Sequence, residues 1–315
     1  MFRRELPWVW VCILGVALGC SPTVQAPGEE AATEQASESR DKSFDSDGVR
    51  IHYTDQGEGE PLILIHGFAM SQDRWEKAGI IDAFVDRGYR VLAIDARGHG
   101  QSDKPHDPAA YGEQIPLDVV RLIEHLDLEQ AYVAGHSMGA IVTNKVRELA
   151  PEKVRAAVLG GAGWQKKGDT VLPGITALEL AEALEETGDF KWMLREFTKD
   201  QQPPATEEEI DGHNERMMHG NDPLALAAVL RGWDGLAVTE QNLRANEVAT
   251  LAVAGADDPL KEKIDDLDGV MSNLEIVVIP NADHFQSLTD PAFVEHVDAF
   301  LGKHPFVGSE PETEE

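Results

Sequence analysis

Short apolar runs alternate with longer amphipathic stretches along residues 47–303. Some runs, such as LILI at 62–65 and LAVAG at 251–255, are apolar at every position, which is typical of strands covered on both faces. The pattern predicts an α/β fold, with a mostly parallel twisted sheet and helices on both faces. Strands are expected at 49–55, 61–66, 90–95, 131–135, 155–160, 250–255 and 274–279. Helices are expected at 72–87, 116–126, 138–149 and 291–301.

Residues 164–248 interrupt this alternation. Stretches such as TALELAEALEE and DPLALAAVLRGW have helical periodicity, and no convincing strand lies between them. Structureless loops above roughly 15 residues are uncommon in compact domains. We therefore expect a helical cap at 164–248, inserted between late strands of a core made of 47–163 and 249–303.

The two ends of the chain differ in composition from this core. The first residues, MFRRELPWVWVCILGVALGC, contain two arginines and then an apolar run, which is shorter than the roughly 20 residues of a membrane-spanning helix. This arrangement is typical of a signal peptide, expected here at 1–19. Residues 20–46 and 304–315 are polar and acidic, which predicts a flexible acidic tether and an acidic tail.

The end of this signal, VALGC at 16–20, resembles the lipobox of bacterial lipoproteins. The resemblance implies cleavage before Cys20, lipidation of its sulfur and, with Ser21 following, anchoring to the outer membrane or cell envelope. The family more often has leucine where this chain has Ala17. The alternatives are an ordinary secretory signal, which would leave the protein periplasmic or secreted, and an uncleaved anchor.

Charge and cysteine content exclude several classes of function. The chain has 315 residues and a formal net charge of −30, with no basic run beyond the signal, so nucleic-acid binding is disfavoured. Both cysteines, Cys12 and Cys20, belong to the N-terminal segment, so the domain has no thiol nucleophile. We expect no metal and no cofactor, because His213, Glu215 and His219 are spaced too irregularly to share a helix face.

The pentapeptide GHSMG at 135–139 is the strongest candidate for chemistry. A G-x-S-x-G sequence arises easily by chance, but this one lies between the strand-like run AYVAG and the helical stretch MGAIVTNKVREL. A nucleophilic serine needs such a tight strand-to-helix turn, with small neighbours that let the backbone close. We therefore predict that Ser137 is a nucleophile.

A serine hydroxyl needs a base, and the base must be oriented by a third group. In this architecture the order along the chain is serine, acid, histidine, each at the carboxyl end of a strand. Of the histidines beyond the last strands, His284 alone follows a strand through a short loop. The acid is expected in the preceding loop, ADDP, where either Asp257 or Asp258 could orient the imidazole.

Five stretches occur in the order seen in one family: LILIHGF (62–68), DARGHGQS (95–102), GHSMG (135–139), GADD (255–258) and NADHF (281–285). With them the chain resembles the α/β-hydrolase superfamily, in the subgroup of bacterial esterases, cofactor-free haloperoxidase-like enzymes and carbon–carbon bond hydrolases. The resemblance implies that Asp258 is the acid, with Asp257 the runner-up. It also implies an oxyanion site built from the backbone N–H groups of Phe68 and Met138. Ala140 departs from the pattern, because many relatives have glycine there.

These residues predict a serine hydrolase that cleaves a carboxylic ester or related acyl bond through an acyl-enzyme. Acyl transfer, perhydrolysis or carbon–carbon hydrolysis would use the same triad, and a non-catalytic surface binding protein is the alternative outside enzymes. Dehalogenases and epoxide hydrolases are disfavoured, because they carry aspartate where this chain has Ser137. The expected partner is a small ester-type molecule, held in an apolar pocket near Trp75 and Trp164. The sequence does not predict the oligomeric state.

Overall fold

A computed structural model describes residues 40–198 and 205–306, which fold around one eight-stranded sheet. The strands of this sheet are β1 (Asp41–Ser46), β2 (Val49–Gln56), β3 (Glu60–Ile65), β4 (Tyr89–Ile94), β5 (Ala131–His136), β6 (Val154–Gly160), β9 (Thr250–Gly255) and β10 (Leu274–Ile279). They lie in the order β1-β2-β4-β3-β5-β6-β9-β10. The β1–β2 and β2–β4 pairs are antiparallel and the remaining pairs are parallel. The predicted α/β fold is therefore confirmed.

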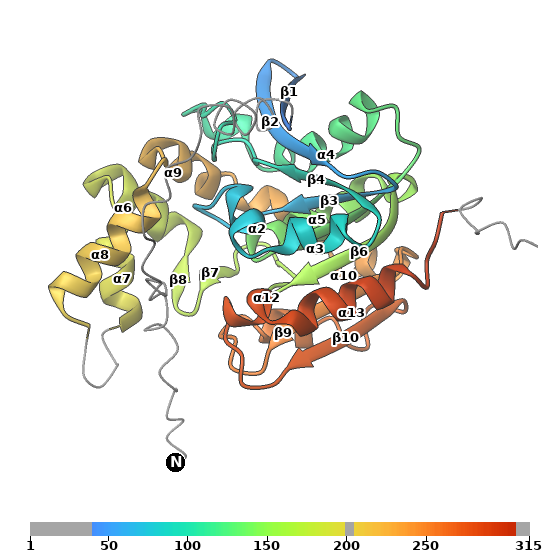
Figure 1. Cartoon of the computed structure of the whole chain (residues 1–315). Coiled ribbons are helices and arrows are strands. Elements are labelled where there is room, and N and C mark those ends of the chain that lie inside the picture. Colours follow the sequence, from blue (N-terminus) through green and yellow to red (C-terminus); the bar gives the residue numbers. More distant parts are fainter. Residues whose placement is uncertain (1–39, 199–204, 307–315) are drawn as a thin grey trace, which may run out of the picture.

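Helices cover both faces of the sheet (Figure 1). The core helices are α2 (Asp73–Lys77), α3 (Ile80–Val85), α4 (Gln114–His125), α5 (Met138–Leu149), α11 (Glu262–Asp265), α12 (Gln286–Thr289) and α13 (Pro291–Leu301). Successive strand residues point to opposite faces, so Ile63 and Ile65 join one core cluster whereas Leu62 and Leu64 join another. The first cluster includes residues of α4, α5 and the cap. The second includes residues of α3 and α13.

The strands lie within one residue of their predicted bounds, because continuous apolar runs mark them clearly. Two other expectations need correction. The helix predicted at 72–87 is divided into α2 and α3 at Gly79, whose φ of 69° is left-handed and ends a helical turn. The tether predicted at 20–46 is too long, because residues 41–46 form β1 and pair with β2, burying Phe44 and Ser46.

Most of the segment predicted as a cap forms the lobe at the left of Figure 1, whereas its last helix lies apart from that lobe, near β6. The segment contains α6 (Ala177–Thr187), α7 (Lys191–Thr198), α8 (Glu207–Met218), α9 (Pro223–Arg231), the short helix η3 (Trp233–Leu236) and α10 (Glu240–Ala245). Thr176 and Thr206 begin α6 and α8 with reciprocal capping boxes. The expectation of no strand was wrong, because β7 (Thr170–Leu172) and β8 (Ile175–Thr176) pair as a small hairpin around Gly174.

A buried ion pair fixes the loop that follows β4. Arg97 donates from Nε to Asp118 Oδ2 of α4 at 2.6 Å, and both side chains are almost fully buried. Asp95 in the same loop accepts hydrogen bonds from His52 and from the backbone amides of Gln72 and Gln101. These contacts hold the loop against β2, α2 and α4, beside the carboxyl end of β3.

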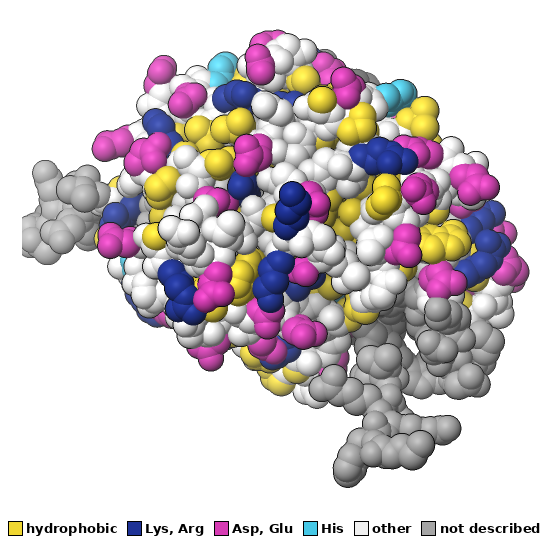
Figure 2. Space-filling view, turned by 180° about the vertical axis from the view of Figure 1, so that it is seen from behind, with side chains coloured by type: hydrophobic (Ala, Val, Ile, Leu, Met, Phe, Trp, Pro, Cys, Tyr) yellow, Lys and Arg dark blue, Asp and Glu magenta, His cyan; other side chains and the backbone are white. Residues whose placement is uncertain are grey.

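The structure does not describe the segment that is predicted to anchor the protein. The predicted signal peptide, Cys20 and most of the tether lie outside the described residues, as does most of the acidic tail. Among the described residues, no helix combines the length and apolar character needed to cross a bilayer. Figure 2 shows acidic and basic side chains interspersed on the rear face rather than gathered into single-sign areas. Lipid anchoring at Cys20 and an envelope location stay predictions.

Candidate active site

Ser137 occupies the turn that joins β5 to α5. Its backbone has φ 58° and ψ −119°, a strained conformation for a residue with a side chain. The flanking glycines make the turn sterically feasible. A Cβ on Gly135 would lie 2.0 Å from the Gly139 carbonyl oxygen, and one on Gly139 would lie 2.0 Å from the Ile65 carbonyl oxygen. Ser137 is half-buried, so its hydroxyl is positioned at the sheet edge rather than enclosed in the core.

The loop after β3 lies against this turn. A Cβ built on Gly67 would be 3.3 Å from Ser137 Cβ, which places the next residue, Phe68, beside the serine. Met138 opens α5, and the first amides of a helix have no intrahelical acceptor. Within the described chain, no hydrogen bond from the Phe68 amide is found either. Two unpaired backbone donors, those of Phe68 and Met138, therefore flank Ser137.

His284 and Asp258 meet at the carboxyl ends of β10 and β9. His284 Nδ1 lies 2.9 Å from Asp258 Oδ2, and Asp258 Oδ1 accepts from the Leu260 amide at 2.8 Å. The Asp258 side chain is 0% exposed, whereas its neighbour Asp257 is exposed and has no hydrogen bond to the imidazole. An ionised carboxylate only accepts, so Nδ1 carries the proton and Nε2 is left with a free lone pair.

His136 joins the serine turn to the His284 loop. Its Nε2 donates to the His284 carbonyl oxygen at 2.9 Å, and the two rings lie 4.8 Å apart between centroids. The Ser137 amide donates to the Gly160 carbonyl at 2.8 Å, and a Cβ on Gly161 would come within 3.0 Å of His284 Nδ1. Ser137, His284 and Asp258 therefore belong to one tightly packed cluster. The sequence predicted His136 only as a spacer, because adjacency in sequence does not reveal this bond.

Aromatic side chains surround Phe68, on the side of the cap. Its ring makes T-shaped contacts with Phe190 and Trp233, each at 6.2 Å between centroids, and with His99 at 5.8 Å. Phe190 and Trp233 belong to the cap and His99 to the loop after β4. The sequence does not predict that these aromatic side chains contact Phe68 beside the serine. Apolar periodicity marks Phe190 and Trp233 as buried, but not against which residue.

The two tryptophans predicted to line the pocket lie on different faces of the sheet. Trp164 belongs to the first core cluster together with Met138, and its indole N–H donates to the Val238 carbonyl at 2.8 Å. Trp75 is fully buried in the second cluster, beneath α3 and α13. The expectation for Trp75 therefore needs correction, because its side chain supports the core on the opposite face and presents no surface to a ligand.

The described residues contain no group of three or more His, Cys, Asp or Glu side chains placed to hold a metal ion. His213 lies within α8, and His219 is the residue that follows the end of this helix. His213 Nδ1 donates to the Glu209 carbonyl one turn earlier. The prediction that the reaction needs neither metal nor cofactor stays a prediction.

Burial keeps three histidines near the site neutral. It lowers the pKa of His66, lowers that of His99 to about 3 and, together with the charge of His284, lowers the pKa of His136 well below 6.5. Burial opposes protonation of His52 as well, but the hydrogen bonds and negative charges of Asp95 and Asp41 together outweigh it and raise that pKa. His52 therefore contributes stability that is present below about pH 6.5 and is lost as the pH rises through its folded pKa.

These shifts predict that the protein is less stable at pH 5 than at pH 7. Below about pH 6.5 the unfolded chain protonates His66, His99 and His136, whereas in the folded protein burial shifts each protonation to lower pH. A histidine that is protonated in the unfolded chain and neutral in the folded protein lowers the free energy of unfolding by about 1.4 kcal/mol for each unit that the pH falls. Urea denaturation followed by circular dichroism at pH 7 and pH 5 measures this difference. An equal or higher midpoint at pH 5 would mean that the three imidazoles are not held neutral.

Comparison with known proteins agrees with this arrangement of strand, turn and loops. A family model described as alpha/beta hydrolase fold matches residues 60–291, which include Ser137, Asp258 and His284. The chain belongs to this α/β-hydrolase family. The match begins at β3 and extends to the start of α13, so it covers the inserted cap and the sheet strands from β3 to β10, whereas β1 and β2 precede it.

Three similar proteins illustrate the range of this α/β-hydrolase family. The non-heme chloroperoxidase of Streptomyces lividans is 42% identical over 123 residues, 37% of this chain and 42% of that protein. The (E)-2-((N-methylformamido)methylene)succinate hydrolase of Acinetobacter baylyi is 38% identical over 117 residues, 37% of this chain and 43% of that protein. The matched segments thus span less than half of these curated relatives. Among solved structures, a hydrolase from Pseudomonas aeruginosa PA01 is 25% identical, with a TM-score of 0.68, covering 83% of this chain and 98% of that one.

Proposed function

We propose that this protein is a serine hydrolase that cleaves a carboxylic ester or a related acyl bond through an acyl-enzyme. The observation that carries the proposal is the His284–Asp258 hydrogen bond of 2.9 Å, packed against the strained turn that bears Ser137. A base that is oriented by a buried carboxylate and lies near a serine hydroxyl is the arrangement that activates a serine. Relatives described as hydrolases and esterases support the same reaction class.

In the proposed reaction, His284 Nε2 takes the proton of Ser137 as Oγ attacks the acyl carbon. The negative charge that develops on the carbonyl oxygen is stabilised by the amides of Phe68 and Met138, each worth about 3 kcal/mol to the transition state. His284 then gives its proton to the leaving alcohol, and the acyl group stays on Oγ. A water molecule, deprotonated by His284, attacks the acyl-enzyme. The acid is released as the proton returns to Ser137.

Aspartate 258 has a positioning role in this scheme. Its carboxylate fixes the tautomer of His284 and stabilises the imidazolium that forms during each proton transfer. Asp257 is disfavoured for that role because it is exposed and the hydrogen bond to the ring comes from Asp258. Ser137 also sets this chain apart from the epoxide hydrolases that share its fold, because the family resemblance implies an aspartate at this position in such enzymes.

Release of 4-nitrophenol from short-chain 4-nitrophenyl esters tests the proposal. We expect saturable turnover by the purified wild-type protein, because the reaction needs only the residues already in place. A folded protein that releases no chromophore above the uncatalysed rate would contradict the proposal and favour a binding role for the same fold.

Acyl transfer or perhydrolysis is a second candidate, favoured by the similarity to proteins described as non-heme chloroperoxidases. Both reactions share the acyl-enzyme and differ only in the nucleophile that attacks it. Adding an alcohol or hydrogen peroxide during ester turnover separates them. Formation of the new ester or peracid in preference to the free acid would favour the second candidate.

A further inference from the structure

Two buried nitrogen atoms beside Phe68 have no hydrogen-bond partner in the described part of the chain. They are Trp233 Nε1 and His99 Nε2, on side chains that are 4% and 0% exposed. Both rings contact the Phe68 ring edge-to-face. Buried polar atoms are normally paired, and leaving one unpaired costs about 1–3 kcal/mol. Other buried atoms of the described residues also lack a partner, but these two both contact Phe68, a residue of the candidate site.

The hydrogen-bonding character of each nitrogen follows from its surroundings. His99 Nδ1 lies 3.1 Å from the Arg97 carbonyl oxygen, so Nδ1 carries the proton and Nε2 is an acceptor. An indole nitrogen is a donor only. The side chains that contact Phe68 thus offer one unused donor, on Trp233, and one unused acceptor, on His99. A hydroxyl group both accepts and donates, which matches this pair.

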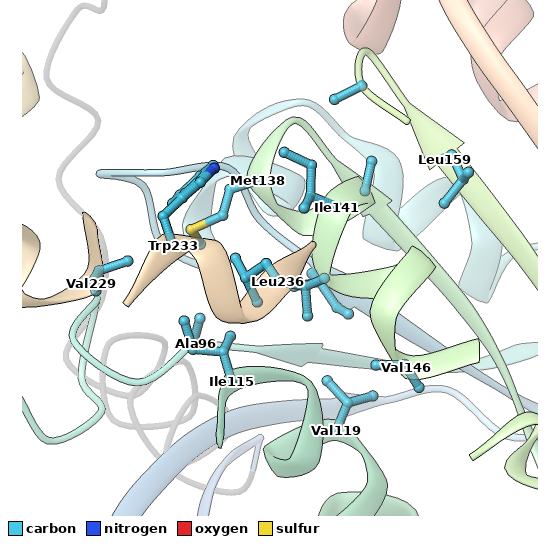
Figure 3. Close-up of a cluster of buried hydrophobic side chains, with 14 of the residues drawn as sticks. Ala96, Ile115, Val119, Met138, Ile141, Val146, Leu159, Val229, Trp233 and Leu236 are labelled. Atoms are coloured by element: carbon cyan, nitrogen blue, oxygen red, sulfur yellow. The ribbon is translucent and has the colours of Figure 1, made fainter. Parts of the chain in front are cut away.

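Trp233 lies near the residues that are proposed to stabilise the oxyanion. Figure 3 shows the Trp233 and Met138 side chains close together, with the indole nitrogen at the end of the ring away from the η3 ribbon. Phe68, proposed to supply one oxyanion amide, packs against this indole, and Met138, proposed to supply the other, belongs to the same core cluster.

We propose that Trp233 and His99 recognise a hydroxyl group on the acyl chain of the substrate, with the indole N–H donating to the hydroxyl oxygen and the imidazole accepting its proton. The inference rests on the proposed hydrolase function and narrows its substrates to hydroxyacyl esters. The surrounding aromatic side chains, Phe68 and Phe190, contact the hydrocarbon part of the chain. Trp233 and His99 are specificity-determining residues in this account, and neither takes part in proton transfer.

The test compares 4-nitrophenyl butanoate with its 2-hydroxy and 3-hydroxy derivatives. We expect kcat/KM of the wild type to be about fivefold higher for at least one hydroxy ester than for the plain ester, as a net hydrogen bond of about 1 kcal/mol implies. In Trp233→Phe this ratio is expected to fall to about one, because the donor is lost while an aromatic ring remains. The ratio compares two esters on the same protein, so a general loss of activity cancels.

Trp75→Phe is the matched control. Trp75 Nε1 is also buried without a partner, but the side chain lies in the second cluster and does not contact Phe68. The ratio in Trp75→Phe should equal that of the wild type. If the wild type turns over the plain ester but prefers neither hydroxy ester, the inference is wrong and the proposed hydrolase function stands. The same holds if Trp233→Phe keeps the preference. Absence of turnover of any ester would overturn the proposed function and, with it, the inference.

Discussion

Replacing Ser137 by alanine is expected to reduce ester hydrolysis by a factor of about 10⁴ or more, which leaves only the residual catalysis of the oxyanion amides and substrate binding. Without Oγ no acyl-enzyme forms, and the intact His284–Asp258 pair and oxyanion amides can only assist attack by water. The left-handed backbone at this position disfavours any residue with a Cβ equally, so alanine adds little new strain to the turn. Steady-state turnover of 4-nitrophenyl esters gives the ratio directly.

Circular dichroism and the thermal midpoint of Ser137→Ala provide the control, since the variant should fold like the wild type. A folded Ser137→Ala protein that hydrolyses esters at the wild-type rate would show that another residue, or the solvent alone, supplies the nucleophile. That outcome would remove Ser137 from the mechanism.

The second large effect is expected from Asp258→Asn, which should lower kcat by about 10⁴ with a smaller change in KM. The asparagine would fill the same buried space and could still accept from the Leu260 amide. Its amide group, however, offers no negative charge to the imidazolium and permits the wrong tautomer of His284. Kinetics with the ester that the wild type turns over fastest measure this loss.

Asp257→Asn is the matched control for that experiment. It makes the same chemical change one residue earlier, on an exposed side chain that does not contact His284. Its kcat should stay close to the wild-type value. A larger loss in Asp257→Asn than in Asp258→Asn would mean that the loop rearranges in solution and that the other aspartate orients the base.

Much of the sheet could be predicted from sequence because a strand buried on both faces must be apolar at every position. The runs at 62–65 and 251–255 follow this rule, and both are strands. The serine turn was predictable for a similar local reason, since only glycine fits at positions 135 and 139. Both features depend only on residues that are close together in the sequence, so a short stretch is enough to predict them.

Features that depend on contacts between distant segments could not be predicted in this way. The local sequence left both Asp257 and Asp258 open and only the family resemblance favoured Asp258, whereas the structure separates them by the hydrogen bond between Asp258 and His284. β1 was predicted as tether because its residues are mostly polar and exposed, and its pairing with β2 supplies the order that composition lacks. The contact of Trp233 with Phe68 likewise joins the cap to the loop after β3.

Reaction with a fluorophosphonate probe, followed by peptide mass spectrometry, tests the central claim most directly. The reagent phosphonylates a serine only when a base activates it and oxyanion donors stabilise the adduct. The account predicts one phosphonyl group per chain, on Ser137, with loss of ester turnover in proportion to labelling. Folded protein that stays unlabelled, or that carries the label on another residue, would contradict it.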